Sequence, residues 1–249
     1  MDTESFREGP EKIDTLFLKF LYYSIVSIMP AFNFDRIADQ YESYYDTDLG
    51  RQVDHVERQL VWRYMIHTSL AKPVLEVGCG TGHWTTFFRQ KGLELNAIDI
   101  SEKMLEKAKE KNPKNVNFEH MDVENMTFPS RKFDSIVAIA TLEFVEDLDR
   151  TLNEIYRVLK PGGYFLAGCL NELSEIGQRK EENDIYRNAR FFTPDQLNEI
   201  LSRFGDPEID GCAIIEKEKI LDYPDIDRIE KPIRLKKGAF LTGLVQKSK

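Results

Sequence analysis

The chain has 249 residues, 41% of them hydrophobic, with a formal net charge of −9 at pH 7. This length suits one α/β domain with an added cap and is short for two independent domains. An acidic chain repels phosphate backbones, which argues against a nucleic-acid substrate; the basic stretch 231–237 is interpreted as a solvated loop. Three widely spaced cysteines argue against a disulfide framework, lack zinc-site spacing and fit a cytoplasmic protein.

The N-terminal 70 residues are predicted to be largely helical. Residues 13–29 are predicted to form an apolar helix that ends before Pro30. Its apolar run of roughly 14 residues is too short for a bilayer span, so no stable membrane insertion is expected. Packing on the domain is favoured, and contact with a lipid interface is the alternative. Helical patterning continues over residues 34–65, and we interpret residues 1–70 as a helical cap over an active site, with the main domain at 71–249.

From residue 72 short apolar runs alternate with helical patterns. The predicted strands are 74–77, 95–98, 116–118, 133–140, 164–169, 211–220 and 239–246, and the predicted helices are 83–90, 101–111, 147–159 and 193–204. Such alternation predicts an α/β fold, a Rossmann-like, doubly wound, mostly parallel seven-stranded sheet with helices on both faces. The late pair of strands is compatible with an antiparallel edge strand.

A glycine-rich loop follows the first of these strands, in the sequence VLEVGCGTG from Val74 to Gly82. The glycines allow a tight turn and let a ligand lie against bare backbone, and free amides at the helix start favour a carboxylate or phosphate. The dinucleotide fingerprint G-x-G-x-x-G fails, because its last position is His83 or Thr85 depending on the starting glycine.

An acid ends the second strand about 20 residues beyond the glycines, where a carboxylate can accept both hydroxyls of a ribose. That acid is Asp99, and a helix-capping role is the alternative. Ile100 and Met104 follow it and could pack on an adenine face.

The VLEVGCGTG segment resembles motif I of the class I S-adenosylmethionine-dependent methyltransferases. The segments FDSIV at 133–137, EIYRVLKPGG at 154–163 and FFTPDQL at 191–197 resemble later segments of its small-molecule branch, the methyltransferase type 11 group with quinone- and sterol-type enzymes. The resemblance covers about residues 74–204; the N-terminal signature of the quinone-type enzymes is not evident. It implies S-adenosyl-L-methionine as cofactor and S-adenosyl-L-homocysteine as product. The residues that it places around the cofactor, besides Asp99, Ile100 and Met104, are Glu76, Gly78, Cys79, Gly80, Gly82, Asp122, Val123 and Ala138.

The resemblance also implies in-line methyl transfer to a small-molecule acceptor, in which the protein mainly positions the reactants and excludes water. A weak nucleophile would need a base, for which Glu143 is the first candidate and His55 the second, ahead of His83 and His120. Aromatic residues that could wall the acceptor site are Tyr41, Tyr44, Tyr45, Trp62 and Tyr186. The alternatives are a cofactor-binding regulator or scaffold without turnover, and an NAD-dependent dehydrogenase. We expect a monomer.

Overall fold

The computed structural model describes residues 33–67, 73–111, 114 and 116–249, which belong to one compact unit. The helix predicted over residues 13–29, with its alternative as an interfacial helix, lies outside the described residues. Within the described residues, no helix has the length and apolar character needed to cross a membrane.

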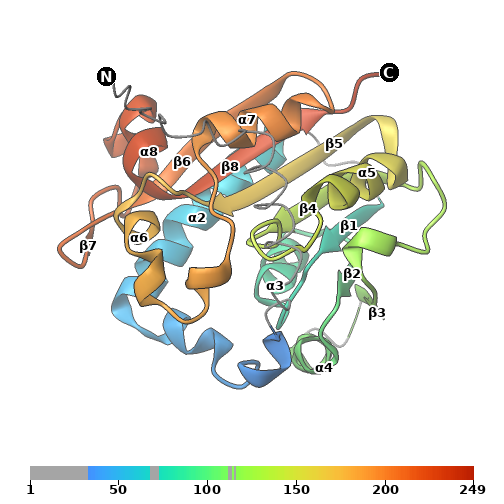
Figure 1. Ribbon diagram of the computed structural model, residues 1–249, viewed down its shortest axis with the longest axis horizontal. Helices are drawn as coiled ribbons and strands as arrows, with labels where there is room; N and C mark the ends of the chain where they lie inside the picture. Colours follow the sequence, from blue (N-terminus) through green and yellow to red (C-terminus); the bar gives the residue numbers. More distant parts are fainter. Residues whose placement is uncertain (1–32, 68–72, 112–113, 115) are drawn as a thin grey trace, which may run out of the picture. The chain divides into compact units, whose positions relative to one another are not determined.

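One mixed sheet organises this unit (Figure 1). Its strands are β1 Val74–Val77, β2 Leu95–Asp99, β3 Val116–His120, β4 Phe133–Ile139, β5 Leu159–Leu170, β6 Pro207–Glu216, β7 Lys219–Ile220 and β8 Gly238–Gln246, in the order β3-β2-β1-β4-β5-β8-β6-β7. Strands β1 to β5 pair in parallel, and β8 runs antiparallel to both of its neighbours, β5 and β6. The predicted Rossmann-like fold is therefore confirmed, including its antiparallel component.

The sheet has eight strands where the sequence predicted seven. The segment 211–220, interpreted as one strand, folds back on itself as β6 and the two-residue β7. Lys217 and Glu218 form the turn with φ angles of 51° and 62°. Two successive left-handed residues are typical of a tight hairpin turn, but a Lys-Glu pair is an unusual sequence for one, so the local pattern did not indicate it.

Helices cover both faces of the sheet, as predicted. They are α2 Asp48–His67, α3 His83–Gln90, α4 Glu102–Lys111, α5 Leu148–Val158, α6 Glu175–Gln178, α7 Pro194–Ser202 and α8 Lys231–Lys237. Shorter 3₁₀ turns are η1 Phe34–Arg36, η2 Tyr41–Asp46, η3 Val123–Asn125, η4 Lys180–Glu182, η5 Tyr186–Asn188 and η6 Ile226–Arg228. Along β4, Ile136 and Ala138 pack with α5 and α7, whereas Val137 and Ile139 pack with α2 and α3. The period-2 alternation of strand side chains thus builds two cores, one on each face.

The helix starts follow their capping residues. Asp147 accepts a hydrogen bond from the N–H of Arg150 and begins α5. Thr193 and Gln196 form a reciprocal capping box at α7, with Pro194 in the first turn. Both starts agree with the sequence prediction.

The basic stretch 231–237 is a helix, α8, and the interpretation as a solvated loop was wrong. Arg234 is only 4% exposed, and its guanidinium binds the Asp210 carboxylate at 3.1 Å (Nε–Oδ1) and 2.5 Å (Nη2–Oδ2). The same guanidinium donates to the carbonyl of Ile226 at 3.0 Å. Because Asp210 lies on β6, far away in sequence, the charge pattern of 231–237 alone could not reveal a buried ion pair.

Helix α2 packs directly on the sheet domain. Val53, Val56 and Leu60 belong to the core that α3, β4 and β8 also build. The described part of the predicted cap, residues 33–67, thus shares a core with the sheet, while a cap role for residues 1–70 as a whole stays a prediction.

Candidate active site at the carboxyl ends of the strands

The loop between β1 and α3 depends on its glycines for two different reasons. Gly78, Gly80 and Gly82 have φ angles of 66°, 51° and 79°, which ordinary residues rarely adopt. A Cβ on Gly78 would lie 2.4 Å from the side chain of Thr141, so this glycine lets the loop after β4 pack against the turn. A Cβ on Gly80 would meet no protein atom within 4 Å. The backbone at Gly80 therefore faces open space that a ligand can occupy.

Glu76 and Cys79 lie before and after Gly78 and connect this turn to neighbouring elements. Glu76 is 2% exposed and accepts a hydrogen bond from the Thr85 hydroxyl of α3 at 2.6 Å. Burial raises the pKa of Glu76 to about 8, and the nearby Asp99 adds to the rise. The N–H of Cys79 donates to the Ile98 carbonyl at 3.0 Å, which ties the loop to the end of β2.

Asp99 connects the glycine loop to α4. Its Oδ2 accepts from the N–H of Gly80 at 2.7 Å and its Oδ1 from the N–H of Ser101 at 2.8 Å. Burial raises the pKa of Asp99, and the two amides oppose the rise. Ser101 caps α4 through the N–H of Met104. Met104 is buried, whereas Ile100 is 62% exposed beside the carboxylate. Asp99 therefore makes the contact expected of a helix-capping residue. Its carboxylate also lies one strand away from the glycine loop, as the ribose interpretation expects.

The neighbouring strands end at the same edge. Asp122 follows β3 and accepts from the N–H of Glu124 at 2.8 Å, and Val123 packs against the core below it. Ala138 lies in β4 opposite Val77 and is fully buried. Because β1 to β4 are parallel, the residues that follow them meet at the carboxyl edge, where open α/β sheets bind ligands.

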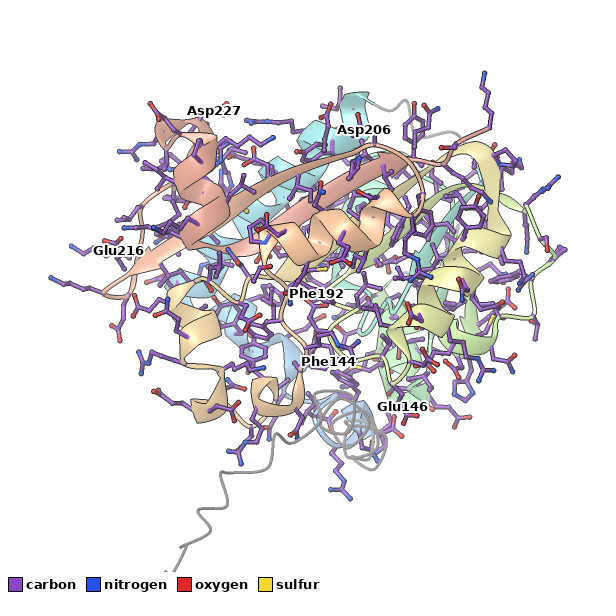
Figure 2. The ribbon with its side chains drawn as sticks, turned by 45° about the horizontal axis from the view of Figure 1, so that its top comes forward. Phe144, Glu146, Phe192, Asp206, Glu216 and Asp227 are labelled. Atoms are coloured by element: carbon purple, nitrogen blue, oxygen red, sulfur yellow. The ribbon has the colours of Figure 1, made fainter. Side chains whose placement is uncertain are left out.

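Glu143 lies on the loop after β4, which Phe144 and Glu146 mark in Figure 2. It is 2% exposed. Its Oε1 accepts from the N–H of Leu170 at 2.7 Å, and its buried Oε2 has no hydrogen-bond partner in the described part of the chain. Burial raises the pKa of Glu143 to about 7, and the Leu170 amide limits the rise. The side chain can therefore exchange a proton near neutral pH.

The loop holding Glu143 begins with backbone strain. Ala140 has a φ of 49°, and its N–H donates to the Gly168 carbonyl at 2.8 Å. Left-handed backbone at an alanine costs about 1–2 kcal/mol and tends to persist at functional sites.

The structure does not bring His55 together with Glu143. His55 is exposed on α2, and its Nε2 lies 3.1 Å from the Pro224 carbonyl. Its ring also contacts Tyr223 edge-on at 5.4 Å. His55 therefore belongs to the packing between α2 and the 221–225 loop.

The other two candidate histidines, His83 and His120, also have structural partners. His83 Nε2 lies 2.6 Å from Asp54 Oδ1, and its ring stacks on Tyr45 at 3.9 Å. Arg58 binds the same Asp54 oxygen at 2.7 Å. His120 Nε2 lies 2.8 Å from the Ile100 carbonyl.

The segment 34–46, which contains η1 and η2, contacts the glycine loop and the start of α4. Glu42 accepts a hydrogen bond from the Thr81 hydroxyl, and Asp35 accepts one from the Ser101 hydroxyl. The segment therefore lies at the carboxyl edge of the sheet, beside the glycine loop.

The pKa of Tyr41 responds to acids that follow two different strands. Burial raises its pKa well above the ordinary value, and Tyr186, Asp99 and Glu143 add to the rise. Its hydroxyl is therefore within electrostatic reach of both the acid after β2 and the acid after β4.

Glu57 is a further buried acid that the sequence reasoning did not single out. It is 9% exposed on α2, and burial, aided by Asp54, raises its pKa to about 8. Its carboxyl also acts on the pKa of Tyr45 and of Tyr186. The available signal was an acid beside Val56 in the apolar stripe of a helix, a position that usually faces the core.

The known proteins to which this chain is similar are described as methyltransferases. A family model described as "Methyltransferase domain" matches residues 75–167. The chain is 32% identical over 163 residues to the malonyl-[acyl-carrier protein] O-methyltransferase of Yersinia pestis, a match covering 65% of this chain and 58% of that protein. It is 28% identical to the enzyme of the same name from Hamiltonella defensa, over 86% of this chain and 79% of that protein. A crystal structure of a SAM-dependent methyltransferase from Thermotoga maritima has a TM-score of 0.68 at 24% identity, covering 86% and 98% of the two chains.

Proposed function

Since this chain belongs to the class I S-adenosylmethionine-dependent methyltransferases, we propose that it transfers a methyl group to a small-molecule acceptor held beside Glu143. The observation that carries the proposal is the open backbone at Gly80, tied to the buried carboxylate of Asp99. When bound, S-adenosylmethionine supplies a methyl group already activated on a sulfonium, so the residues around it need only bind, orient and exclude water.

The cofactor-binding residues follow the edge of the sheet. The loop at Gly78 to Gly82, with Glu76 beneath it, would hold the amino-acid end, and Asp99 would accept the ribose hydroxyls in place of part of its amide contacts. Residues proposed around the adenine are Ile100, Met104, Asp122 and Val123, and Ala138 would lie under the methyl-transfer side.

Glu143 is proposed as the general base. Its Oε2 is buried and unpaired among the described residues, and its pKa of about 7 suits proton uptake near neutral pH. Buried acids with perturbed pKa values are typical of catalytic sites. This favours an enzyme over the alternative, a cofactor-binding regulator or scaffold without turnover.

The names of the curated relatives raise a second acceptor class, a carboxyl group carried by a protein. The aligned part of this chain spans 58% of the Yersinia pestis protein, and the malonyl-[acyl-carrier protein] specificity named there belongs to that enzyme. A carboxylate acceptor is already a nucleophile and needs no base, so it would leave the tuned acid at Glu143 without a role.

The test compares two glycine variants with matched backbone strain. Gly80 and Gly92 have φ angles of 51° and 84°, and a Cβ at either position meets no protein atom within 4 Å. Both Gly80→Val and Gly92→Val should lower stability by a similar amount, but only Gly80→Val should abolish calorimetric binding of S-adenosylhomocysteine. Wild-type affinity in folded Gly80→Val would refute the proposed cofactor site.

Turnover is tested with methyl-labelled S-adenosylmethionine and the small-molecule and protein fractions of a cell extract. We expect label in the small-molecule fraction, with at least a tenfold slower transfer by Glu143→Gln. Cofactor binding with no transferred label would favour the regulator or scaffold, and label confined to protein would favour a carrier-bound acceptor.

A further inference from the structure

Residues 34–46, which we call the edge segment, contact the loop after β1 and the start of the helix after β2. The hydroxyl of Thr81, in the glycine loop after β1, donates a hydrogen bond to the carboxylate of Glu42. The hydroxyl of Ser101, which begins α4 after β2, donates one to Asp35 at 2.5 Å. These two bonds therefore join the edge segment to the two places between which the cofactor is proposed to bind.

A third contact of the edge segment reaches the loop after β4. The ring of Phe34 meets the ring of Phe144 edge-on, with the ring centroids 5.0 Å apart. Phe144 follows Glu143 in the chain and is labelled in Figure 2. Strands β2 and β4 are the two neighbours of β1 in the sheet. The edge segment, drawn in blue beside α4 in Figure 1, thus crosses the carboxyl edge where open sheets bind ligands.

Surface contacts account for most of the attachment of the edge segment. Among residues 34–46, only Ala38 is buried. The carboxylate of Asp39 binds Lys107 of α4 at 2.7 Å, but its side chain is 89% exposed, and exposed ion pairs contribute little to stability. In α2, by contrast, Val56 is fully buried in the core. A segment with so few buried contacts can open locally while the rest of the domain stays folded.

Thr47 separates the edge segment from α2. Its backbone is extended, with φ of −79° and ψ of 157°, and its hydroxyl accepts a hydrogen bond from the N–H of Gly50 at 2.9 Å. Thr47 therefore caps a helix that is fixed in the core, at the position where the edge segment ends. Hinges of mobile elements are typically such residues at the end of an element.

We propose that the edge segment is a lid over the cofactor site, closed by the hydrogen bonds of Asp35 and Glu42 and hinged at Thr47. This inference rests on the proposed cofactor site and adds how ligands reach and leave it. The lid opens when both closing bonds break, which admits S-adenosylmethionine and releases S-adenosylhomocysteine. When closed, it excludes water from the site during methyl transfer.

The lid predicts a specific kinetic pattern. Both closing bonds join protein groups to each other, so weakening them favours the open lid equally with and without a ligand beneath it. A larger open fraction of the free protein speeds association, and a larger open fraction of the complex speeds dissociation. The two rate constants then rise together, and their ratio, the dissociation constant, changes little. A residue that binds the ligand itself would instead mainly speed dissociation.

The experiment measures both rate constants for S-adenosylhomocysteine on the full chain by surface plasmon resonance. The double variant Asp35→Ala/Glu42→Ala removes both closing bonds. We expect association and dissociation each to become at least fivefold faster, while the dissociation constant changes less than twofold. Asp35→Asn and Glu42→Gln, which keep the side-chain shape, should give smaller changes in the same direction. The control Asp149→Ala removes an exposed acid on α5 that binds Arg203 at 2.6 Å, and should have wild-type rate constants.

Three results would overturn the lid. Wild-type rate constants in the double variant would show that the edge segment does not control access. Faster dissociation with unchanged association would show that Asp35 and Glu42 bind the ligand directly. Equal acceleration in Asp149→Ala would show that the effect does not come from the edge segment. Absence of S-adenosylhomocysteine binding in the wild type would instead refute the proposed function.

Discussion

The burial of Glu143 predicts that replacing it with glutamine stabilises the protein in a pH-dependent way. Below about pH 4.5 the carboxyl is protonated in the folded and unfolded chain, so it has no effect on stability. Between pH 4.5 and about 7 the unfolded chain releases the proton and the folded chain keeps it, so the wild type loses stability as the pH rises. Above about pH 7 the loss is complete.

The magnitude follows from the rise in pKa from 4.5 to about 7. At about 1.4 kcal/mol for each tenfold change in the ionisation equilibrium, the ionised group costs the folded state about 3 kcal/mol. Glutamine avoids this cost because its amide stays neutral, and its oxygen can still accept from the N–H of Leu170, which binds Glu143 at 2.7 Å. The unpaired Oε2 becomes an unpaired NH₂ group, which resembles the unpaired carboxyl of the protonated wild type.

The assay is urea unfolding of wild type and Glu143→Gln at pH 5, 6, 7 and 8, with Glu199→Gln as the exposed control. We expect the Glu143→Gln variant to match the wild type within about 1 kcal/mol at pH 5 and to exceed it by about 3 kcal/mol at pH 8. The control should follow the wild type throughout. A stability difference between Glu143→Gln and wild type that does not change with pH would refute the burial argument.

Three further predictions separate binding from stability. Asp99→Ala should weaken S-adenosylhomocysteine binding by about 1–3 kcal/mol, because a buried acceptor is lost, and unchanged affinity by calorimetry would argue against the ribose assignment. Arg234→Ala should destabilise the fold by about 3–5 kcal/mol, since it leaves the 4%-exposed Asp210 unpaired; a denaturation midpoint close to wild type would contradict this. Thr193→Ala removes the cap of α7 and should lower the free energy of unfolding by about 1 kcal/mol with no change in cofactor affinity, so a loss of affinity would show that α7 acts on the site.

Local sequence patterns were sufficient to predict the elements at the edge of the sheet where the cofactor is proposed to bind. The strand, glycine turn and helix from Val74 to Gln90 are encoded by consecutive residues, and Asp99 follows from the end of the next strand. Each of these features depends on the spacing of apolar side chains along the chain and on the backbone preferences of glycine. Both act over a few residues. The structure accordingly has β1, α3 and β2 close to where the sequence predicted them.

The surroundings of several candidate residues were decided by long-range contacts. Glu57 on α2, Glu143 on the loop after β4 and Tyr186 on η5 come from separate parts of the chain, and neither strand order nor helix docking can be read from the local pattern of any of them. Arg234 is a second example. Its charge suggested a solvent-exposed side chain, but the structure pairs it with Asp210 on β6.

The sequence by itself thus determined the fold class and the strand–glycine turn–helix unit of this protein, because hydrophobic period and turn chemistry are local properties. Only the tertiary structure decided which acids are buried and which distant groups bind each other, as Glu143 binds the Leu170 amide and Arg234 binds Asp210. Burial and electrostatic partnership depend on how distant segments pack, and that packing sets the pKa values on which the proposed chemistry rests.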